Sequence, residues 1–207
     1  MKTLLQLNTS LYSSGGQSSR LADEFVSAWR GRNPQSRVIR RDLATEPVPH
    51  LTAERFAAFL SKPDERTSVQ QSVVDYSDRL IDELKRADVI VLGLPMYNFG
   101  VPSVLKAYFD HIARAGVTFQ YTEKGPVGLL RAKKVYVLAA RGGQYAGTAL
   151  DTQTSYVRQF VALLGMTDVE FVYAEGLAIS EANKQISIAG AKTAIQALTR
   201  EDWPAAA

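Results

Sequence analysis

Five short apolar runs recur along the chain, and they alternate with stretches in which apolar residues return at the three- and four-residue spacing of a helix. The most uniform run, residues 89–94, ends at Pro95, which predicts a parallel strand that is buried on both faces. The strands are expected at residues 3–8, around Val38 and Ile39, and at residues 89–94, 134–140 and 169–174. Strands that alternate with helices predict a parallel sheet with helices on both of its faces.

The spacing predicts helices from Ser18 or Ser19 to about Trp29, and over residues 52–60, 68–87, 102–114, about 156–164, and 181–200. Ser18 or Ser19 is the expected N-cap of the first helix, because a serine hydroxyl can satisfy free amide groups at a helix start. Apart from its one short helix, the segment 43–67 is predicted to be irregular, and residues 116–130 are predicted to form a loop. Pro204 and the alanines after it are expected to form a frayed end.

The order of the strands can be predicted from their connections. Right-handed crossovers between five strands favour the flavodoxin-like order 2-1-3-4-5, a three-layer α/β sandwich whose switch point lies between strands one and three. Since no internal repeat or second domain is visible, residues 1–207 are predicted to form a single domain with a sizeable core. Ligands of such sheets bind at the carboxyl ends of the strands, beside the switch point.

Composition narrows the classes of function. Hydrophobic residues make up 46% and charged residues 22%, which is ordinary for a globular protein, and the lack of cysteine excludes disulfides, thiolate metal ligands and cysteine nucleophiles. The N-terminal apolar run is too short for a signal peptide, and no apolar stretch reaches bilayer length, so a cytoplasmic enzyme or carrier without a membrane partner is expected. The net charge of +3 comes without long basic runs, which argues against binding to nucleic acid.

Three loops that follow predicted strands carry the candidate chemistry. Residues 9–19 are rich in hydroxyls and glycine and lead into a helix start, which suits a phosphate, although a plain serine-rich loop would have the same composition. Residues 96–99 combine aromatic rings with an amide, and the Gly142–Gly143 pair either admits a ligand to the backbone or makes a sharp turn. No nucleotide P-loop or dinucleotide fingerprint is present. Because the strand order brings the three loops together, they predict a crevice of flavin size.

Two motifs are more specific than composition: Met-Tyr-Asn-Phe at residues 96–99 and Ala-Arg-Ala-Gly-Val-Thr-Phe at residues 113–119. The same resemblance is carried by Pro95 and by the segments 106–110, 121–123, 141–143 and 174–176. Over nearly its whole length the chain resembles the FMN-dependent NAD(P)H azoreductase and quinone oxidoreductase family. The resemblance implies a flavodoxin-like fold, one FMN per subunit and an obligate homodimer.

The resemblance also implies positions for the cofactor. The FMN phosphate and ribityl chain would lie at Ser10, Gly16, Gln17 and Ser18, and the flavin ring against Met96, Tyr97, Asn98, Phe99, Ala140, Arg141, Gly142 and Gly143. Many family members have serine where this chain has Gly16 and Ala140, so neither position can offer a side-chain hydrogen bond here.

The flavin, rather than a catalytic side chain or a metal, would carry the chemistry. NADH or NADPH is expected to deliver a hydride and leave, and a quinone, azo compound or nitroaromatic would then take two electrons at the same face, in ping-pong order. Amide groups of Gly142 and Gly143 are candidates to stabilise the reduced flavin. The aromatic residues Phe59, Phe119 and Tyr121 are expected to bind the acceptor across a dimer interface.

The alternative function is that of a flavodoxin-type electron carrier, a binding module rather than an enzyme. Such carriers are usually strongly acidic, whereas this chain is basic. A receiver domain of the same topology would need acidic residues at the end of strand one, where Asn8, Thr9 and Ser10 stand. His111, alone on its helix, is expected to be structural. No sequence pattern reads the ribose 2′ position, so NADH and NADPH remain equal candidates.

Overall fold

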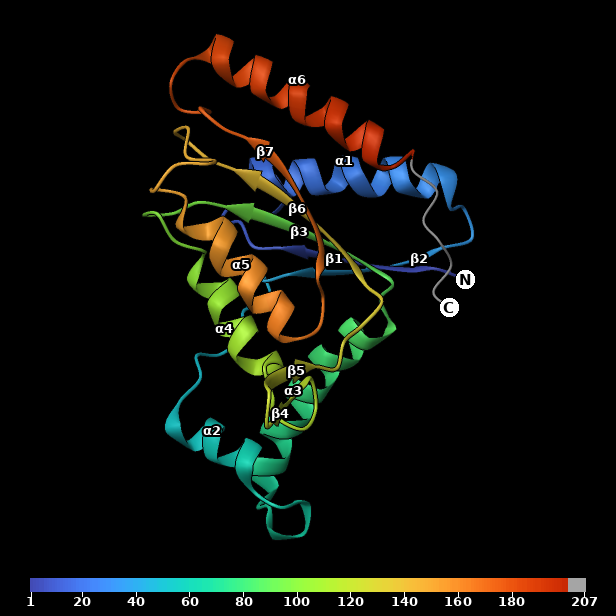
Figure 1. Cartoon of the computed structure of the whole chain (residues 1–207), viewed down its shortest axis with the longest axis vertical. Coiled ribbons are helices and arrows are strands. Elements are labelled where there is room, and N and C mark those ends of the chain that lie inside the picture. Colours follow the sequence, from blue (N-terminus) through green and yellow to red (C-terminus); the bar gives the residue numbers. More distant parts are fainter. Residues whose placement is uncertain (201–207) are drawn as a thin grey trace.

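A computed structural model describes residues 1–200, which fold around a parallel sheet of five strands (Figure 1). The strands are β1 (Thr3–Asn8), β2 (Arg37–Asp42), β3 (Val89–Pro95), β6 (Lys134–Ala140) and β7 (Asp168–Ala174). Their order, β2-β1-β3-β6-β7, confirms the predicted flavodoxin-like order. The central strand β3 is buried along its whole length, as its unbroken apolar run predicts, and β2 is a partly exposed edge. The frayed end predicted at Pro204 lies outside the described residues.

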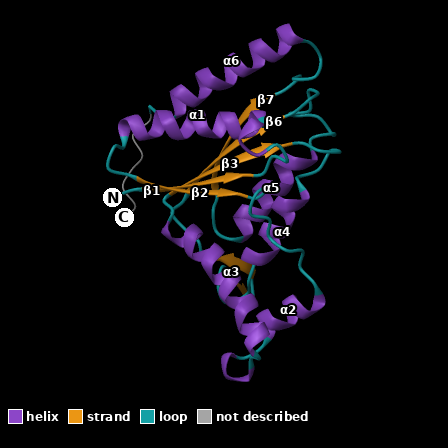
Figure 2. Ribbon diagram, turned by 180° about the vertical axis from the view of Figure 1, so that it is seen from behind, coloured by secondary structure: helices purple, strands orange, loops and turns teal. Residues whose placement is uncertain are grey.

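Helices cover both faces of the sheet (Figures 1 and 2). One face carries α1 (Gln17–Arg32) and α6 (Glu181–Leu198), and the other carries α3 (Ser68–Arg86), α4 (Ser103–Ile112) and α5 (Thr152–Leu163). Each face has its own apolar core, to which α1 contributes Phe25 and α4 contributes Phe109. Burying a side chain of this kind is worth roughly 1.5–3 kcal/mol, so the two cores fix the helices that frame the sheet.

The short helix α2 (Ala53–Leu60) lies away from the sheet and packs on α3 (Figure 1). Only Ala58 of α2 is buried, while Phe56 and Leu60 are 51% and 69% exposed. The predicted helix over residues 52–60 is therefore present, but most of its apolar side chains contact no core. None of the helices in the described part of the chain is long and apolar enough to cross a membrane.

A β-hairpin stands where the sequence predicts a loop, so that prediction is wrong. Strands β4 (Phe119–Thr122) and β5 (Gly125–Gly128) pair in antiparallel fashion through a two-residue turn. Strands of four residues give too short an alternation to recognise in the sequence, and Gly125 closes the turn with φ +107°. The hairpin packs on the end of α5, where a side chain on Gly128 would collide with the backbone of Gly165.

Several helices begin at other residues than the sequence predicts: α2 begins one residue later, at Ala53, and α5 begins at Thr152 instead of near residue 156. Gly16 is the N-cap of α1, so Ser18 and Ser19 lie inside the first turn rather than before it. Helix α4 begins at Ser103, with Pro102 as its N-cap. Because α1 starts earlier, Ser18 and Ser19 belong to the first turn of the helix and do not cap it. This matters for the candidate site, which includes the helix N-terminus.

Candidate functional site

Three loops meet at the carboxyl ends of β1, β3 and β6, at the left of the sheet in Figure 1. Tyr97 follows β3, and Ser10 and Leu11 follow β1. The hydroxyl of Tyr97 lies 3.3 Å from Ser10 Oγ and accepts a hydrogen bond from the Leu11 amide at 3.2 Å. The Met96 amide donates to the carbonyl of Ala140, at the end of β6, over 3.1 Å. The loops that the strand order is predicted to bring together are thus in direct contact.

The start of α1 presents hydrogen-bond donors that lack acceptors. The amide groups of Gln17, Ser18 and Ser19 open the helix and therefore have no acceptor within it. The hydroxyls of Ser18 and Ser19 are buried and have no partner among the residues that the structure describes. Buried polar groups are rarely left unpaired in a complete site, and a helix N-terminus favours an anion. This helix start therefore fits a phosphate group.

Two glycines allow the β1–α1 loop to pack tightly. A side chain at Gly16 would collide with Ser10, whose Oγ accepts a hydrogen bond from the Tyr12 amide at 3.2 Å. A Cβ at Gly93, in β3, would lie 3.0 Å from the carbonyl oxygen of Ser18. The position of Ser10 is therefore coupled to the absence of a side chain at Gly16: a Cβ at position 16 would lie 2.6 Å from the Cβ of Ser10, so a serine there would require the backbone of the loop to shift.

The segment after β3 is a tight turn. The backbone groups of Tyr97 and Gly100 bond to each other over 3.2 and 2.9 Å, and Asn98 and Phe99 between them have φ +49° and +60°. Two consecutive positive φ values are typical of a type I′ turn. Asparagine adopts a positive φ readily, whereas a bulky phenylalanine does so at a cost of order 1–3 kcal/mol. The Gln153 amide group helps to offset this cost by donating to the carbonyl of Pro95, at the end of β3, at 2.9 Å and to that of Gly100, at the end of the turn, at 2.8 Å.

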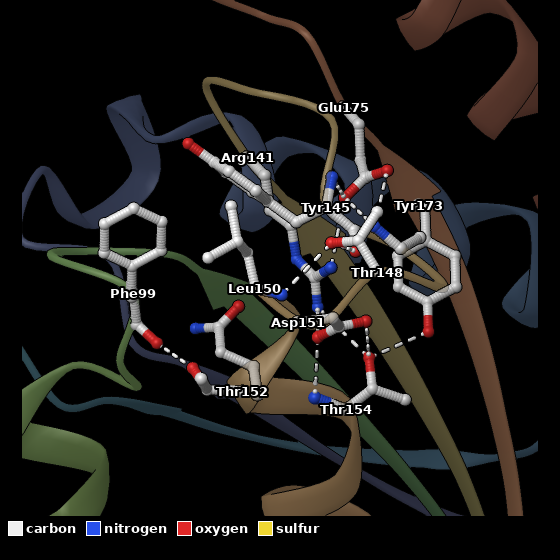
Figure 3. A network of polar contacts seen from close by, with 12 residues as sticks. Phe99, Arg141, Tyr145, Thr148, Leu150, Asp151, Thr152, Thr154, Tyr173 and Glu175 are labelled. Carbon is white, nitrogen blue, oxygen red and sulfur yellow. Dashed lines mark hydrogen bonds and ion pairs between the residues drawn. The ribbon is translucent and has the colours of Figure 1, made fainter.

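The loop after β6 exposes two amide groups. The carbonyls of Gly142 and Gly143 accept hydrogen bonds from Ala178 at 3.0 Å and Gly176 at 2.8 Å, but their own N–H groups have no acceptor within residues 1–200. The side chain of Arg141 is fully buried and bonded to two carboxylates (Figure 3), and its backbone N–H and carbonyl bond to Ala174 at 2.9 Å and Leu177 at 3.1 Å, so the free polar groups of this loop are those of the two glycines. Two adjacent free amides suit an anionic group.

The predicted acceptor-binding residues do not reach these loops within one chain. Phe59 packs edge-on to His111, 5.8 Å between ring centroids, at the end of α4 that is remote from the loops. Phe119 and Tyr121 lie in the hairpin, where Phe119 is 8% and Tyr121 75% exposed. Since the ten residues of α4 span about 15 Å, these rings lie well away from the turn at Asn98.

Several residues of the site escape sequence reasoning. Tyr145 lies against Gly143, where a side chain would require the Tyr145 ring to move, and it meets the ring of Phe99 edge-on at 5.5 Å. Asp151 caps α5, and an aspartate just before a helical pattern is a signal that could have been read. Glu175 falls in a segment that carries the family resemblance, but nothing local in the sequence indicates its partner Arg141.

His111 is a buried histidine away from the crevice, which agrees with a structural role. Its Nδ1 lies 3.0 Å from the Ala107 carbonyl, and its Nε2 has no partner in the described chain. Burial lowers the pKa of His111 more than that carbonyl raises it. A lowered pKa means that the unfolded chain binds the proton first, so stability should be lost as the pH falls below about 6.5, the ordinary pKa of histidine.

We therefore expect the urea midpoint of unfolding to fall between pH 7 and pH 5.5 in the native protein. The variant His111→Phe keeps an aromatic ring between Phe59 and Tyr76 and should lose most of this pH dependence. His50, which is exposed, provides the control variant His50→Phe, which should retain it. An equal pH dependence in all three proteins would contradict the assignment.

The comparisons with known proteins agree with this architecture. The model of a family described as having a flavodoxin-like fold matches residues 1–198. An FMN-dependent NADH:quinone oxidoreductase of Cellvibrio japonicus (strain Ueda107) is 55% identical over 196 residues, which cover 95% of this chain and 98% of that protein. This chain belongs to the flavodoxin-like quinone oxidoreductase and azoreductase family. The resemblance found in its sequence motifs is thereby confirmed.

Solved structures of this family superpose closely on the chain. An azoreductase from Bacillus anthracis str. Sterne gives a TM-score of 0.88 at 26% identity, over 96% of this chain and 99% of that one. An FMN-dependent NADH-azoreductase from Bacillus anthracis str. Ames Ancestor, solved in complex with FMN, gives a TM-score of 0.85 at 25% identity, over 97% and 100% of the two chains.

Proposed function

We propose that this protein is an FMN-dependent oxidoreductase that takes electrons from NADH and transfers two at a time to quinones and aromatic azo compounds. The observation that carries the proposal is the set of donors without acceptors in the described chain, on two of the loops that meet at the carboxyl ends of the strands. The first turn of α1 offers amides and the hydroxyl of Ser18, and the loop after β6 offers the amides of Gly142 and Gly143. The activities in the names of the relatives support the same conclusion.

Each loop has its own part in holding the cofactor. Ser10, Gly16, Gln17 and Ser18 would hold the phosphate and ribityl chain, and the flavin ring would lie against residues 96–99 and 140–143. FMN, when bound, supplies hydride uptake from NADH and two-electron reduction of the acceptor. The amides of Gly142 and Gly143 would stabilise negative charge on the ring, as donors in an oxyanion hole do. We assign no catalytic side chain, and protons come from solvent.

We further propose a homodimer in which the second copy completes the active site. Four large apolar side chains on α2, α3 and the hairpin are strongly exposed: Phe56 by 51%, Leu60 by 69%, Val69 by 73% and Tyr121 by 75%. Exposed apolar surface of this kind marks an association site. Phe59 and Tyr121 lie far from the cofactor loops of their own chain, so in a two-fold dimer they would lie over the loops of the partner. Phe119, which is only 8% exposed and packs in the core of its own chain, would support Tyr121 rather than bind the acceptor itself.

Replacing Tyr121 by aspartate is a direct test of this dimer. The variant should bind FMN as the native protein does, while its NADH:quinone rate falls roughly tenfold or more, because a carboxylate would be placed without a counter-charge in an apolar interface. The matched control is Ile186→Asp, which places the same charge at a site that is 73% exposed on α6. Equal rates in the two variants would refute the interface.

The same proposal extends to finer properties. NADPH is an alternative electron donor, and nitroaromatics are further acceptors. Residues 1–207 form one domain. The protein works in the cytoplasm, where NADH is supplied. Both substrates would use one face of the flavin in turn, so double-reciprocal plots should give parallel lines. The decisive assay mixes purified protein, NADH and a small quinone. An enzyme oxidises NADH under these conditions, whereas an electron carrier of the flavodoxin type requires a protein partner.

A further inference from the structure

Arg141 is the centre of a buried ionic cluster directly before the two free amides (Figure 3). Its guanidinium lies 3.0 Å from Glu175 Oε1, 2.9 Å from Asp151 Oδ1 and 3.2 Å from the hydroxyl of Thr154. The ring of Tyr173 covers its face, 5.0 Å from the guanidinium carbon to the ring centroid. The Arg141 side chain is not exposed at all, and those of Asp151 and Glu175 are 7% and 15% exposed.

The cluster holds both ends of the segment 142–151. Glu175 Oε1 also accepts the amides of Tyr145 and Ala146, each at 3.0 Å, just after the two glycines. At the other end, Asp151 caps α5 by accepting the Thr154 amide at 3.0 Å. Arg141 binds both carboxylates, so one guanidinium connects the two ends of the loop.

The charges of the cluster do not balance. Two carboxylates face one guanidinium, which leaves a net charge of about −1 inside the protein. Burial raises the pKa of Asp151, but hydrogen bonds from Arg141 and Thr154 outweigh this effect and leave that pKa below its ordinary value, so the carboxyl is ionised at neutral pH. A charge in the protein interior is weakly screened and acts on neighbouring sites more strongly than a charge in water.

We propose that Arg141 is a positioning residue that fixes the amides of Gly142 and Gly143 for the flavin, and that the excess carboxylate charge around it lowers the reduction potential of the bound flavin. The amides favour a reduced, negatively charged ring, and the carboxylates oppose it. The carboxylates thereby make the reduced flavin a stronger reductant than the amides alone would leave it. This inference rests on the proposed function, since it concerns the same cofactor.

The positioning part is tested with Arg141→Lys, which keeps the charge but not the several fixed donors of a guanidinium. Apoprotein titrated with FMN should bind about tenfold more weakly, because one lost hydrogen bond to a charged group is worth roughly that factor. Arg114→Lys is the matched control. Arg114 is 8% exposed, bonds Asp78 at 2.5 Å and Ser77 at 3.1 Å, and lies over the ring of Phe59, but at the far end of α4.

The expected result is a loss of thermal stability in both lysine variants and a loss of FMN affinity in Arg141→Lys alone. Equal FMN affinities in the two variants would overturn the positioning role. Amide hydrogen exchange of residues 142–146 in the apoprotein gives a second reading that needs no cofactor. Exchange should accelerate in Arg141→Lys and stay unchanged in Arg114→Lys, and unchanged exchange in both would contradict the clamp.

The charge part is tested by removing one negative charge while keeping an oxygen acceptor. Glu175→Gln and Asp151→Asn should each move the flavin midpoint potential to a more positive value, measured by equilibration with redox dyes. Asp78→Asn, at the Arg114 pair, should leave it unchanged. Potentials that stay constant, or that shift by the same amount in all three variants, would overturn the charge effect. If the native protein takes up no FMN, the proposed function fails, and the exchange experiment still judges the clamp.

Discussion

Replacing Asn98 by proline is expected to abolish FMN retention while the sheet and its helices stay folded. Proline fixes φ near −65°, whereas Asn98 has φ +49°, so the type I′ turn cannot form. A conflict of this size costs about 3 kcal/mol or more and should weaken FMN binding by more than about 100-fold. The effect should extend to the β1–α1 loop, because Tyr97 beside it bonds the Leu11 amide.

The control for this variant is Asn98→Gly, which loses the side chain but accepts a positive φ at no steric cost. It should retain FMN within roughly tenfold of the native affinity, and circular dichroism should show the native helix content in both proteins. If Asn98→Pro binds FMN as tightly as Asn98→Gly does, the flavin ring does not lie on this turn.

The double variant Ser10→Ala, Ser18→Ala should lose FMN by a second route, at the phosphate end. Hydrogen bonds to charged groups are worth about 1.5–3 kcal/mol each, so two of them correspond to a loss of affinity of roughly 100-fold or more. Ser10 is 1% exposed and its Oγ lies beside Tyr97, and the buried hydroxyl of Ser18 has no partner among residues 1–200. Fluorescence titration of the apoprotein with FMN measures the loss.

Ser18 alone gives a sharper outcome, because stability and affinity should move in opposite directions. Removing an unsatisfied buried hydroxyl relieves the apoprotein of a desolvation cost, so Ser18→Ala should melt at the same temperature or higher while it binds FMN more weakly. Ser14→Ala, at an exposed serine of the same loop, should change neither property. Native affinity in the Ser18 variant would remove this hydroxyl from the site.

The sequence predicts the sheet well because its signals are long and consistent. The run that becomes β3 is apolar on both faces, and crossover rules leave few strand orders to choose from. The hairpin at Phe119 escapes prediction because four-residue strands give almost no periodic signal. The N-cap of α1 is misplaced by two residues because serines inside a first turn have the same residue types as serines that cap it.

The loops of the site can be predicted from topology, but the contacts that position them cannot. Arg141 meets Asp151 and Glu175, which lie 10 and 34 residues further along the chain, so no local pattern connects them. The aromatic residues Phe59 and Tyr121 can be identified as surplus to one core, but only the fold shows that they lie away from their own crevice. Their assignment to the crevice of a second copy stays a prediction.

The absorption spectrum of the purified protein tests the central claim most directly. Protein supplied with FMN and freed of excess cofactor should show the visible bands of a bound flavin, close to one per chain. NADH added without air should bleach these bands, and a small quinone should restore them, with no second protein present. A chain that retains no flavin, or a bound flavin that NADH leaves unbleached, would contradict the account.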